Sequence, residues 1–131
     1  WSGLKGNGGL MKILAYLLQT NLEWQDAQVR VNVVAADAEE ASDRRQTVAP
    51  ILDQLRTGAT LNVIEADGRI FDEIVRDTSR DADIVFLGMA TPEEEADYVS
   101  YYTRLHERTA GLPPTVFVLA AEDISFRKVL A

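Results

Sequence analysis

Hydrophobic and polar positions alternate with two different periods along this chain. Four stretches repeat apolar residues at three- and four-residue spacing, which predicts helices, and four shorter stretches are alternating or continuously apolar, which predicts strands. Helix and strand follow each other four times, and this order predicts a parallel sheet with helices on both faces. The predicted helices span residues 10–18, 37–55, 70–75 and 91–105, and the predicted strands span residues 28–35, 61–65, 84–87 and 115–120.

Capping and turn residues mark several boundaries of these elements. Asp37 with Glu40 three residues later is typical of a capped helix start. The Thr-Pro-Glu-Glu run at residues 91–94 is a second sequence typical of a helix start, with a cap residue, proline in the first turn and acidic residues after it. Gly58 follows the second helix as a stop signal, and residues 67–68 form an Asp-Gly turn.

The fold class predicted from this order is α/β, a doubly wound parallel unit within one domain. A length of 131 residues suits one hydrophobic core, so we expect residues 1–131 to form a single domain. The first strand of a doubly wound fold is usually central, yet the pattern begins with a helix. A strand before that helix lies at Trp1 to Leu4 or upstream of the sequence. Because the chain begins with Trp1, we interpret it as a piece of a longer polypeptide.

Charge and composition restrict the classes of partner. The chain carries 21 acidic and 13 basic side chains, a net charge of −8. An acidic chain without a basic stripe does not favour nucleic acid or an anionic lipid surface as a partner. The sequence contains no cysteine, so disulfides and thiolate metal sites are excluded. No apolar run reaches the roughly 20 residues that a membrane-spanning helix needs.

A glycine-rich stretch, GLKGNGGLM at residues 3–11, is the first candidate binding site. Glycines before a helix can bring backbone N–H groups close to an anion, and Lys5 could add positive charge. The stretch matches neither the Walker A motif nor the dinucleotide fingerprint. Two interpretations therefore remain open: an anion or nucleotide site at Lys5, Gly6, Gly8 and Gly9, or a flexible turn with glycines at positive φ.

Other side chains give no convincing catalytic constellation. His106 is the only histidine, and it lies in a charged helix without a cysteine or second histidine to complete a metal site. Asp81 and Asp83 flank a strand without EF-hand spacing, so we interpret them as polar loop residues. No serine lies in a nucleophile elbow. We therefore expect no enzymatic activity, no metal and no catalytic residue.

A tyrosine stripe at helical spacing is the second candidate surface. Tyr98, Tyr101, Tyr102 and Leu105 fall on one face of the fourth predicted helix. Such a stripe favours packing in a core or at an interface over a ligand cage. Both alternatives, burial in the core and a dimer surface, remain open.

Three stretches in the same order resemble a known family. The three stretches are WSGLKGNGGLMKILAYLL from residue 1, IVRDTSRDADIVFLGMA from residue 74, and YYTRLHERTAGLPPTVFVLAAEDISF from residue 101. They resemble the cytoplasmic C-terminal domain of prokaryotic cation–chloride cotransporter-like permeases, which belong to the amino acid–polyamine–organocation superfamily. The resemblance extends from Trp1 to about Phe126.

This resemblance implies a regulatory function for the domain. In such transporters the domain lies at the cytoplasmic face of the membrane, folds like the universal stress proteins, and assists dimerisation. It implies a homodimer whose other partner is its own transmembrane domain, with no chemistry, no cofactor and no direct lipid binding. The family also has an aspartate-containing strand just before the tryptophan, so the place of the first strand, at Trp1 to Leu4 or upstream of the sequence, stays open.

The likeness to universal stress proteins implies an alternative function. Some of those proteins bind ATP through a glycine-rich signature after the fourth strand, which ends in Gly-Ser or Gly-Thr. The corresponding stretch here, residues 87–92, reads LGMATP and contains one glycine. This departure disfavours the usual nucleotide mode, and a free-standing adenine-nucleotide-binding module remains the alternative.

Overall fold

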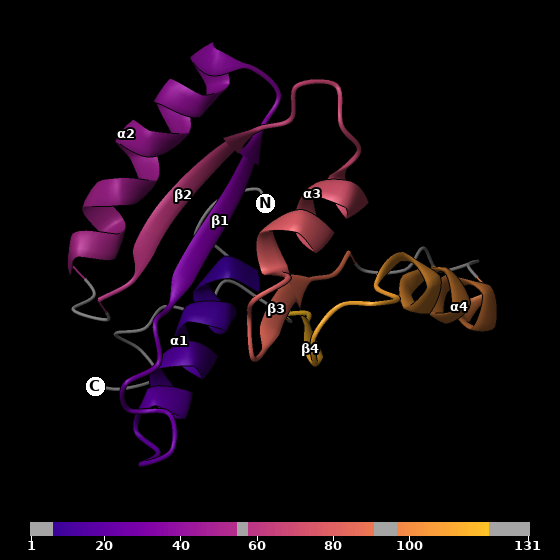
Figure 1. Ribbon diagram of the computed structural model, residues 1–131, viewed down its shortest axis with the longest axis horizontal. Coiled ribbons are helices and arrows are strands. Elements are labelled where there is room, and N and C mark those ends of the chain that lie inside the picture. The colour runs from indigo at the N-terminus through magenta and orange to yellow at the C-terminus, as the bar shows by residue number, and fades with distance from the viewer. Residues whose placement is uncertain (1–6, 55–57, 91–96, 121–131) are drawn as a thin grey trace.

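The computed structural model describes residues 7–54, 58–90 and 97–120 as four helices and four short strands (Figure 1). Helix and strand alternate throughout, which confirms the predicted α/β class and element order. None of the helices in these ranges is both long enough and apolar enough to cross a bilayer. The elements are α1 Asn7–Gln19, β1 Arg30–Ala35, α2 Ala38–Gln54, β2 Thr60–Glu65, α3 Phe71–Ser79, β3 Val85–Gly88, α4 Tyr98–Arg108 and β4 Thr115–Val118.

The strands form two separate parallel pairs. β1 pairs with β2 over six residues, from Arg30 opposite Thr60 to Ala35 opposite Glu65. β3 pairs with β4 over four residues, from Val85 opposite Thr115. Parallel pairing is therefore confirmed, but within the described ranges no ladder joins β1 to β3. The expectation of parallel strands is thus confirmed, whereas one continuous sheet is not seen in the described residues.

The first pair carries the clearest hydrophobic core. The side chains of Val31 and Val33 on β1 pack against Val48 and Leu52 of α2, and all four are at most 9% exposed. Alternate residues of a strand point to the same face of its sheet. The buried residues of β1 are at alternate positions, as expected where helices cover one face of the sheet. Figure 1 shows α2 lying along this pair.

The predicted start of α2 is confirmed by its hydrogen bonds. The backbone N–H of Glu40 donates to the Asp37 side chain at 2.9 Å, and the Ala36 N–H donates to the Glu40 carboxylate at 2.7 Å. These two bonds satisfy N–H groups that have no partner inside the helix. The bond from Ala36, followed by the one from Arg44, holds the pKa of Glu40 below its ordinary value.

The Asp-Gly turn between β2 and α3 is also confirmed. Asp67 has φ +50° and Gly68 has φ +77°, and the Arg69 N–H donates to the Ala66 carbonyl at 2.9 Å. Two consecutive positive φ angles strongly favour glycine and aspartate or asparagine. Of the apolar residues in the helix predicted at residues 70–75, Ile74 is buried, whereas Ile70 and Phe71 are 60% and 43% exposed.

Helix α4 lies at one end of the molecule, away from α2 (Figure 1). It begins at Tyr98, and Asp97 caps it by accepting a bond from the Val99 N–H at 3.0 Å. The predicted start at residues 91–94 lies outside the described residues. A hydrogen bond from the Ser100 hydroxyl, followed by the one from Val99, lowers the pKa of Asp97.

Candidate functional sites

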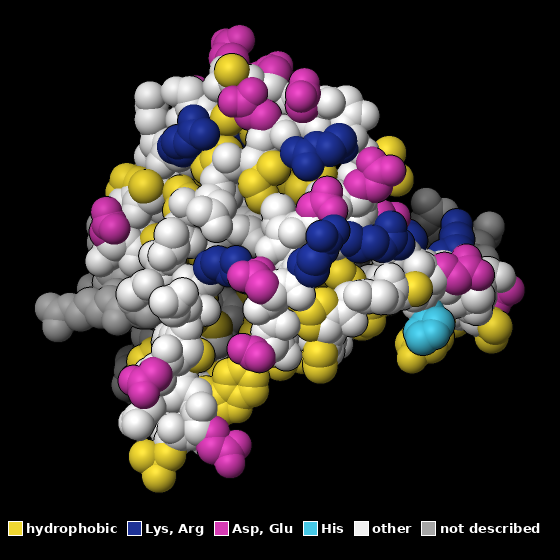
Figure 2. Space-filling view, in the orientation of Figure 1, with side chains coloured by type: hydrophobic (Ala, Val, Ile, Leu, Met, Phe, Trp, Pro, Cys, Tyr) yellow, Lys and Arg dark blue, Asp and Glu magenta, His cyan; other side chains and the backbone are white. Residues whose placement is uncertain are grey.

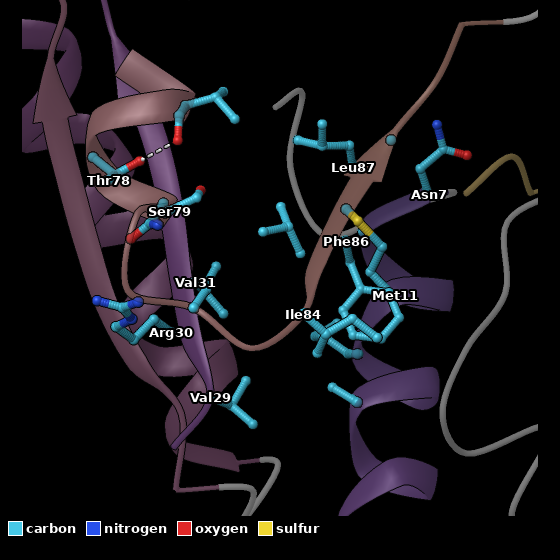
Figure 3. A pocket seen from close by; sticks show the side chains of 18 of the residues that line it. Asn7, Met11, Val29, Arg30, Val31, Thr78, Ser79, Ile84, Phe86 and Leu87 are labelled. Carbon is cyan, nitrogen blue, oxygen red and sulfur yellow. Dashed lines mark hydrogen bonds between the residues drawn. The ribbon is translucent and has the colours of Figure 1, made fainter. Parts of the chain in front are cut away.

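A cavity of about 1170 Å³ separates the two strand pairs. The edges of β1 and β3 line it, together with residues of α1 and α3. Figure 3 shows Val29 and Val31 on the β1 side and Leu87 on the β3 side, with their side chains directed into the space between the strands.

The polar groups of this cavity are few and dispersed. Ser79 is 6% exposed, and its hydroxyl makes no hydrogen bond within the described chain. Lys12 of α1 also lines the cavity, and burial lowers the pKa of its amine. No carboxylate of the described chain lies within ion-pair distance of that amine. A buried hydroxyl without a partner is costly, so it indicates a group that completes the site.

The side-chain amide of Asn7 makes hydrogen bonds at the carboxyl ends of β3 and β4. Its Nδ2 donates to the Met89 carbonyl at 2.9 Å, and its Oδ1 accepts from the Ala120 N–H at 2.7 Å. A Cβ at Gly88 would lie only 3.2 Å from Asn7 Nδ2, so glycine permits this close approach. The first residue of α1 therefore fastens that helix to both strands of the second pair.

The glycine-rich stretch does not form the predicted flexible turn in its described part. Gly8 and Gly9 lie inside the first turn of α1 and are buried, so the expectation of glycines at positive φ there is wrong. Tertiary packing overrides the low helix propensity of glycine. Lys5 and Gly6 lie outside the described residues, while Gly8 lines the cavity between the strand pairs.

The tyrosine stripe lies at the surface. Tyr98 and Tyr102 are 66% and 68% exposed, which excludes burial in the core of this chain as described. Tyr101 is half-buried, and its hydroxyl donates to the Ala90 carbonyl at 2.7 Å. A shallow apolar groove of about 530 Å³ runs beside these rings to Phe117 of β4. Figure 2 shows hydrophobic side chains at the surface around α4.

The remaining candidate residues take structural or solvent-exposed positions. Asp81 forms a two-bond pair with Arg30, at 2.9 and 3.3 Å, and the Arg30 guanidinium lowers the pKa of Asp81. Asp83 and His106 are exposed. In the described ranges, no three His, Cys, Asp or Glu side chains are close enough to hold a metal ion.

Arginine side chains connect α3 to α4. Arg108 makes three bonds of 2.9 to 3.1 Å to the Asp72 carboxylate, and these bonds raise the pKa of Arg108. Arg76 donates to the carbonyls of Arg108 and Ala110, at 3.0 and 3.4 Å. Figure 2 shows basic and acidic side chains side by side across the middle of the molecule. These arginines have partners within the fold, so they do not form a free basic patch.

Comparisons with protein families, with curated proteins and with solved structures found no match to this chain. The site therefore rests on geometry alone. Sequence reasoning missed Asn7, Lys12 and Ser79, because nothing in their local sequence distinguishes them from ordinary helix residues. Only the contacts of Asn7, with residues more than 80 positions away, identify its importance.

Proposed function

We propose that this chain is a non-catalytic regulatory and dimerising domain of a cation–chloride cotransporter-like permease. The observation that carries the proposal is the uncovered aromatic surface of α4, where Tyr98 and Tyr102 are 66% and 68% exposed. Aromatic side chains are enriched at protein interfaces and depleted at ordinary surfaces. The three stretches that resemble the permease domain support the identity of the parent protein.

The two strand pairs are, in this proposal, the halves of one universal-stress-protein-like sheet. Both pairs are parallel, and β1 and β3 are edge strands on either side of the same cavity. The plain chemistry of the carboxyl ends supports a role without catalysis. Ala36, Ala66 and Met89 directly follow β1, β2 and β3, and the amide of Asn7 is already bonded to backbone groups at the ends of β3 and β4.

Sedimentation equilibrium of the chain at increasing concentration tests the dimer. We expect a monomer–dimer equilibrium in the micromolar range, and we expect the double variant Tyr98→Ser/Tyr102→Ser to stay monomeric with an unchanged melting temperature. Leu22→Ser is the matched control, because Leu22 is 82% exposed and lies in the loop after α1. A chain that remains monomeric at several hundred micromolar contradicts the dimerising role.

The sequence of the parent polypeptide tests the transporter. A series of apolar segments of about 20 residues upstream of Trp1 is the expected result. A parent without such segments contradicts the permease assignment, while the dimer experiment remains valid on its own.

Adenine-nucleotide binding is the alternative, and the size of the cavity is the observation that favours it. Ligand pockets typically measure about 300–1000 Å³, so the cavity of about 1170 Å³ has room for a nucleotide. Against it, the Asn7 amide occupies the carboxyl ends where phosphates would bind. Calorimetric titration with MgATP separates the two functions: we expect no heat of binding, and saturable binding would favour the alternative.

A further inference from the structure

Asn7 is followed by Gly8, which makes it chemically unlike the other asparagines of the sequence. Asn21 is followed by leucine, and Asn32 and Asn62 are followed by valine. Glycine has no side chain to shield its backbone nitrogen, and its backbone reaches conformations that other residues avoid. The side-chain amide of an asparagine is therefore most open to attack by the next backbone nitrogen when the next residue is glycine.

The place of Gly8 in α1 keeps its backbone nitrogen outside the hydrogen bonds of that helix. The first four N–H groups of a helix have no acceptor within it. Gly8 is the second residue of α1, so its N–H is one of these groups. In the middle of a helix the same N–H would donate to the carbonyl four residues earlier. The hydrogen bonds of α1 therefore do not protect the Asn7–Gly8 pair from this reaction.

Two hydrogen bonds hold the side-chain amide of Asn7 at the carboxyl ends of β3 and β4. Its Nδ2 donates to the Met89 carbonyl at 2.9 Å, and its Oδ1 accepts from the Ala120 N–H at 2.7 Å. Figure 3 shows this side chain beside the end of β3. Attack by the Gly8 nitrogen requires the amide carbon to turn toward it, so both bonds must break first. The reaction is therefore limited to conformations in which the start of α1 has separated from β3 and β4.

The surroundings of this side chain suit an amide and do not suit a carboxylate. An amide donates one bond and accepts another, whereas an ionised carboxylate only accepts. A carboxylate at residue 7 would place negative charge against the Met89 carbonyl oxygen. The fit to β3 is also close, since a Cβ at Gly88 would lie 3.2 Å from Asn7 Nδ2. Conversion of Asn7 to aspartate therefore removes one bond and replaces it with repulsion.

We propose that Asn7 and Gly8 form a self-modification site, at which deamidation of Asn7 permanently separates the start of α1 from β3 and β4. The Gly8 nitrogen forms a bond to Cγ of Asn7, the bond from Cγ to Nδ2 breaks, and ammonia leaves with the proton of the Gly8 N–H. Water then adds to one carbonyl carbon of the cyclic imide, and the ring nitrogen regains a proton. The product is aspartate or isoaspartate, and water is the sole co-reactant.

The modification acts in one direction. Opening of α1 is reversible while the amide of Asn7 is intact, because the bonds to Met89 and Ala120 can form again. Neither product has the Nδ2 donor, so neither restores the bond to Met89. The inference is independent of the transporter assignment and of the dimer, because the reacting groups and their partners all lie within this chain.

Mass spectrometry of tryptic peptides measures the modification in the 131-residue chain. The peptide of residues 6–12 contains Asn7, and Asn21 lies in a separate peptide and is the internal control. We expect aspartate and isoaspartate to accumulate at residue 7, about 10- to 100-fold more slowly in the folded chain than in guanidinium chloride. Asn21 should change much more slowly than Asn7 when the chain is unfolded. No product at residue 7 of the folded chain, after complete conversion of the unfolded chain, would overturn the proposal.

Two variants separate local opening of α1 from unfolding of the whole chain. Gly88→Ala places a methyl group against the Asn7 amide and leaves both reacting residues unchanged, so it should speed the modification about tenfold. Leu52→Ala weakens the core of the β1–β2 pair and should leave the rate unchanged. An acceleration by Leu52→Ala as large as that by Gly88→Ala, or no acceleration by either variant, would overturn the proposal.

Amide hydrogen exchange in the modified chain tests the structural consequence. We expect exchange at Met11, in the first turns of α1, to become about tenfold faster, with unchanged exchange at Val33 of β1 as the control. The encoded variant Asn7→Asp supplies one product in pure form and should give the same change. Equal exchange at Met11 before and after the modification would overturn the proposal, because the start of α1 would then stay in place without the amide.

Discussion

The two halves of this molecule are stabilised in different ways. The β1–β2 half has six-residue strands and a core of Val31, Val33, Val48 and Leu52, all at most 9% exposed. The β3–β4 half has four-residue strands, and Val85 and Val118 are its buried strand residues. Around it, long-range hydrogen bonds from Asn7, Arg76 and Arg108 connect the elements. Apolar burial dominates the first half, and polar contacts connect the second.

This difference has a physical consequence for function. The free energy gained by burying apolar side chains does not depend on direction, and it is lost where those side chains are exposed. Hydrogen bonds are directional, so a few of them can hold two elements together while the apolar faces of those elements stay exposed. The second half accordingly carries the exposed tyrosines of α4, while α2 lies against its own sheet. We therefore expect the second half to be the binding half, and the first half to be the scaffold.

The largest expected effect is in the core of the first half. Leu52→Ala removes a side chain that is 5% exposed and leaves a cavity beside Val31 and Val33, so it should cost about 2–5 kcal/mol of unfolding free energy. The matched control in the second half is Leu119→Ala, at 41% exposure, with an expected loss of less than about 1 kcal/mol. Urea unfolding measures both, and equal losses would remove the distinction between the halves.

Asn7→Ala should have the next largest effect, confined to the second half. The variant leaves the Met89 carbonyl and the Ala120 N–H without their partner, at an expected cost of about 1–3 kcal/mol. Asn21→Ala is the control, because the Asn21 side chain is exposed and accepts only a local bond from Glu23. Faster amide exchange at Ala120 with unchanged exchange at Val33 is the expected signature. Uniformly faster exchange would indicate that α1 stabilises both halves.

A smaller effect is expected at the connection between α3 and α4. The Asp72 and Arg108 side chains are 23% and 56% exposed, so their pair should contribute no more than about 1 kcal/mol. A double-mutant cycle with Asp72→Asn and Arg108→Gln measures this coupling free energy. The pair of Asp77 and Arg80, with exposures of 54% and 81%, is the control and should give nearly zero. Equal coupling at both pairs would show that burial does not distinguish them.

Sequence alone predicted the features that depend on neighbouring residues. The helix start at Asp37 and Glu40 and the turn at Asp67 and Gly68 were recoverable, because their bonds span at most four residues. The α/β class followed from the alternation of apolar periods. Parallel pairing followed from the same alternation, since each pair of strands is joined through a helix.

Features that depend on distant contacts were not predictable. Asn7 bonds to residues 82 and 113 positions away, and the bonds from α3 to α4 join residues 32 to 36 positions apart. Gly8 and Gly9 were expected in a turn, yet packing holds them in a helix. The tyrosine stripe was recognised, but only the exposure of Tyr98 and Tyr102 decided between core and surface.

The smallest expected effect is the pH response of α4, which reports on the polar contacts of the second half. Bonds from Ser100 and Val99 lower the folded-state pKa of Asp97 below its ordinary value of 3.8. The stabilisation by this cap is therefore fully present above that value and is lost as the pH falls through the lowered pKa. Amide exchange in the first turn of α4 should accelerate below about pH 4, and Asp97→Asn should remove that step, because asparagine caps without titrating. An identical acid response in both proteins would assign the change to other carboxylates, such as Asp81, and would leave the Asp97 cap without a part in holding α4.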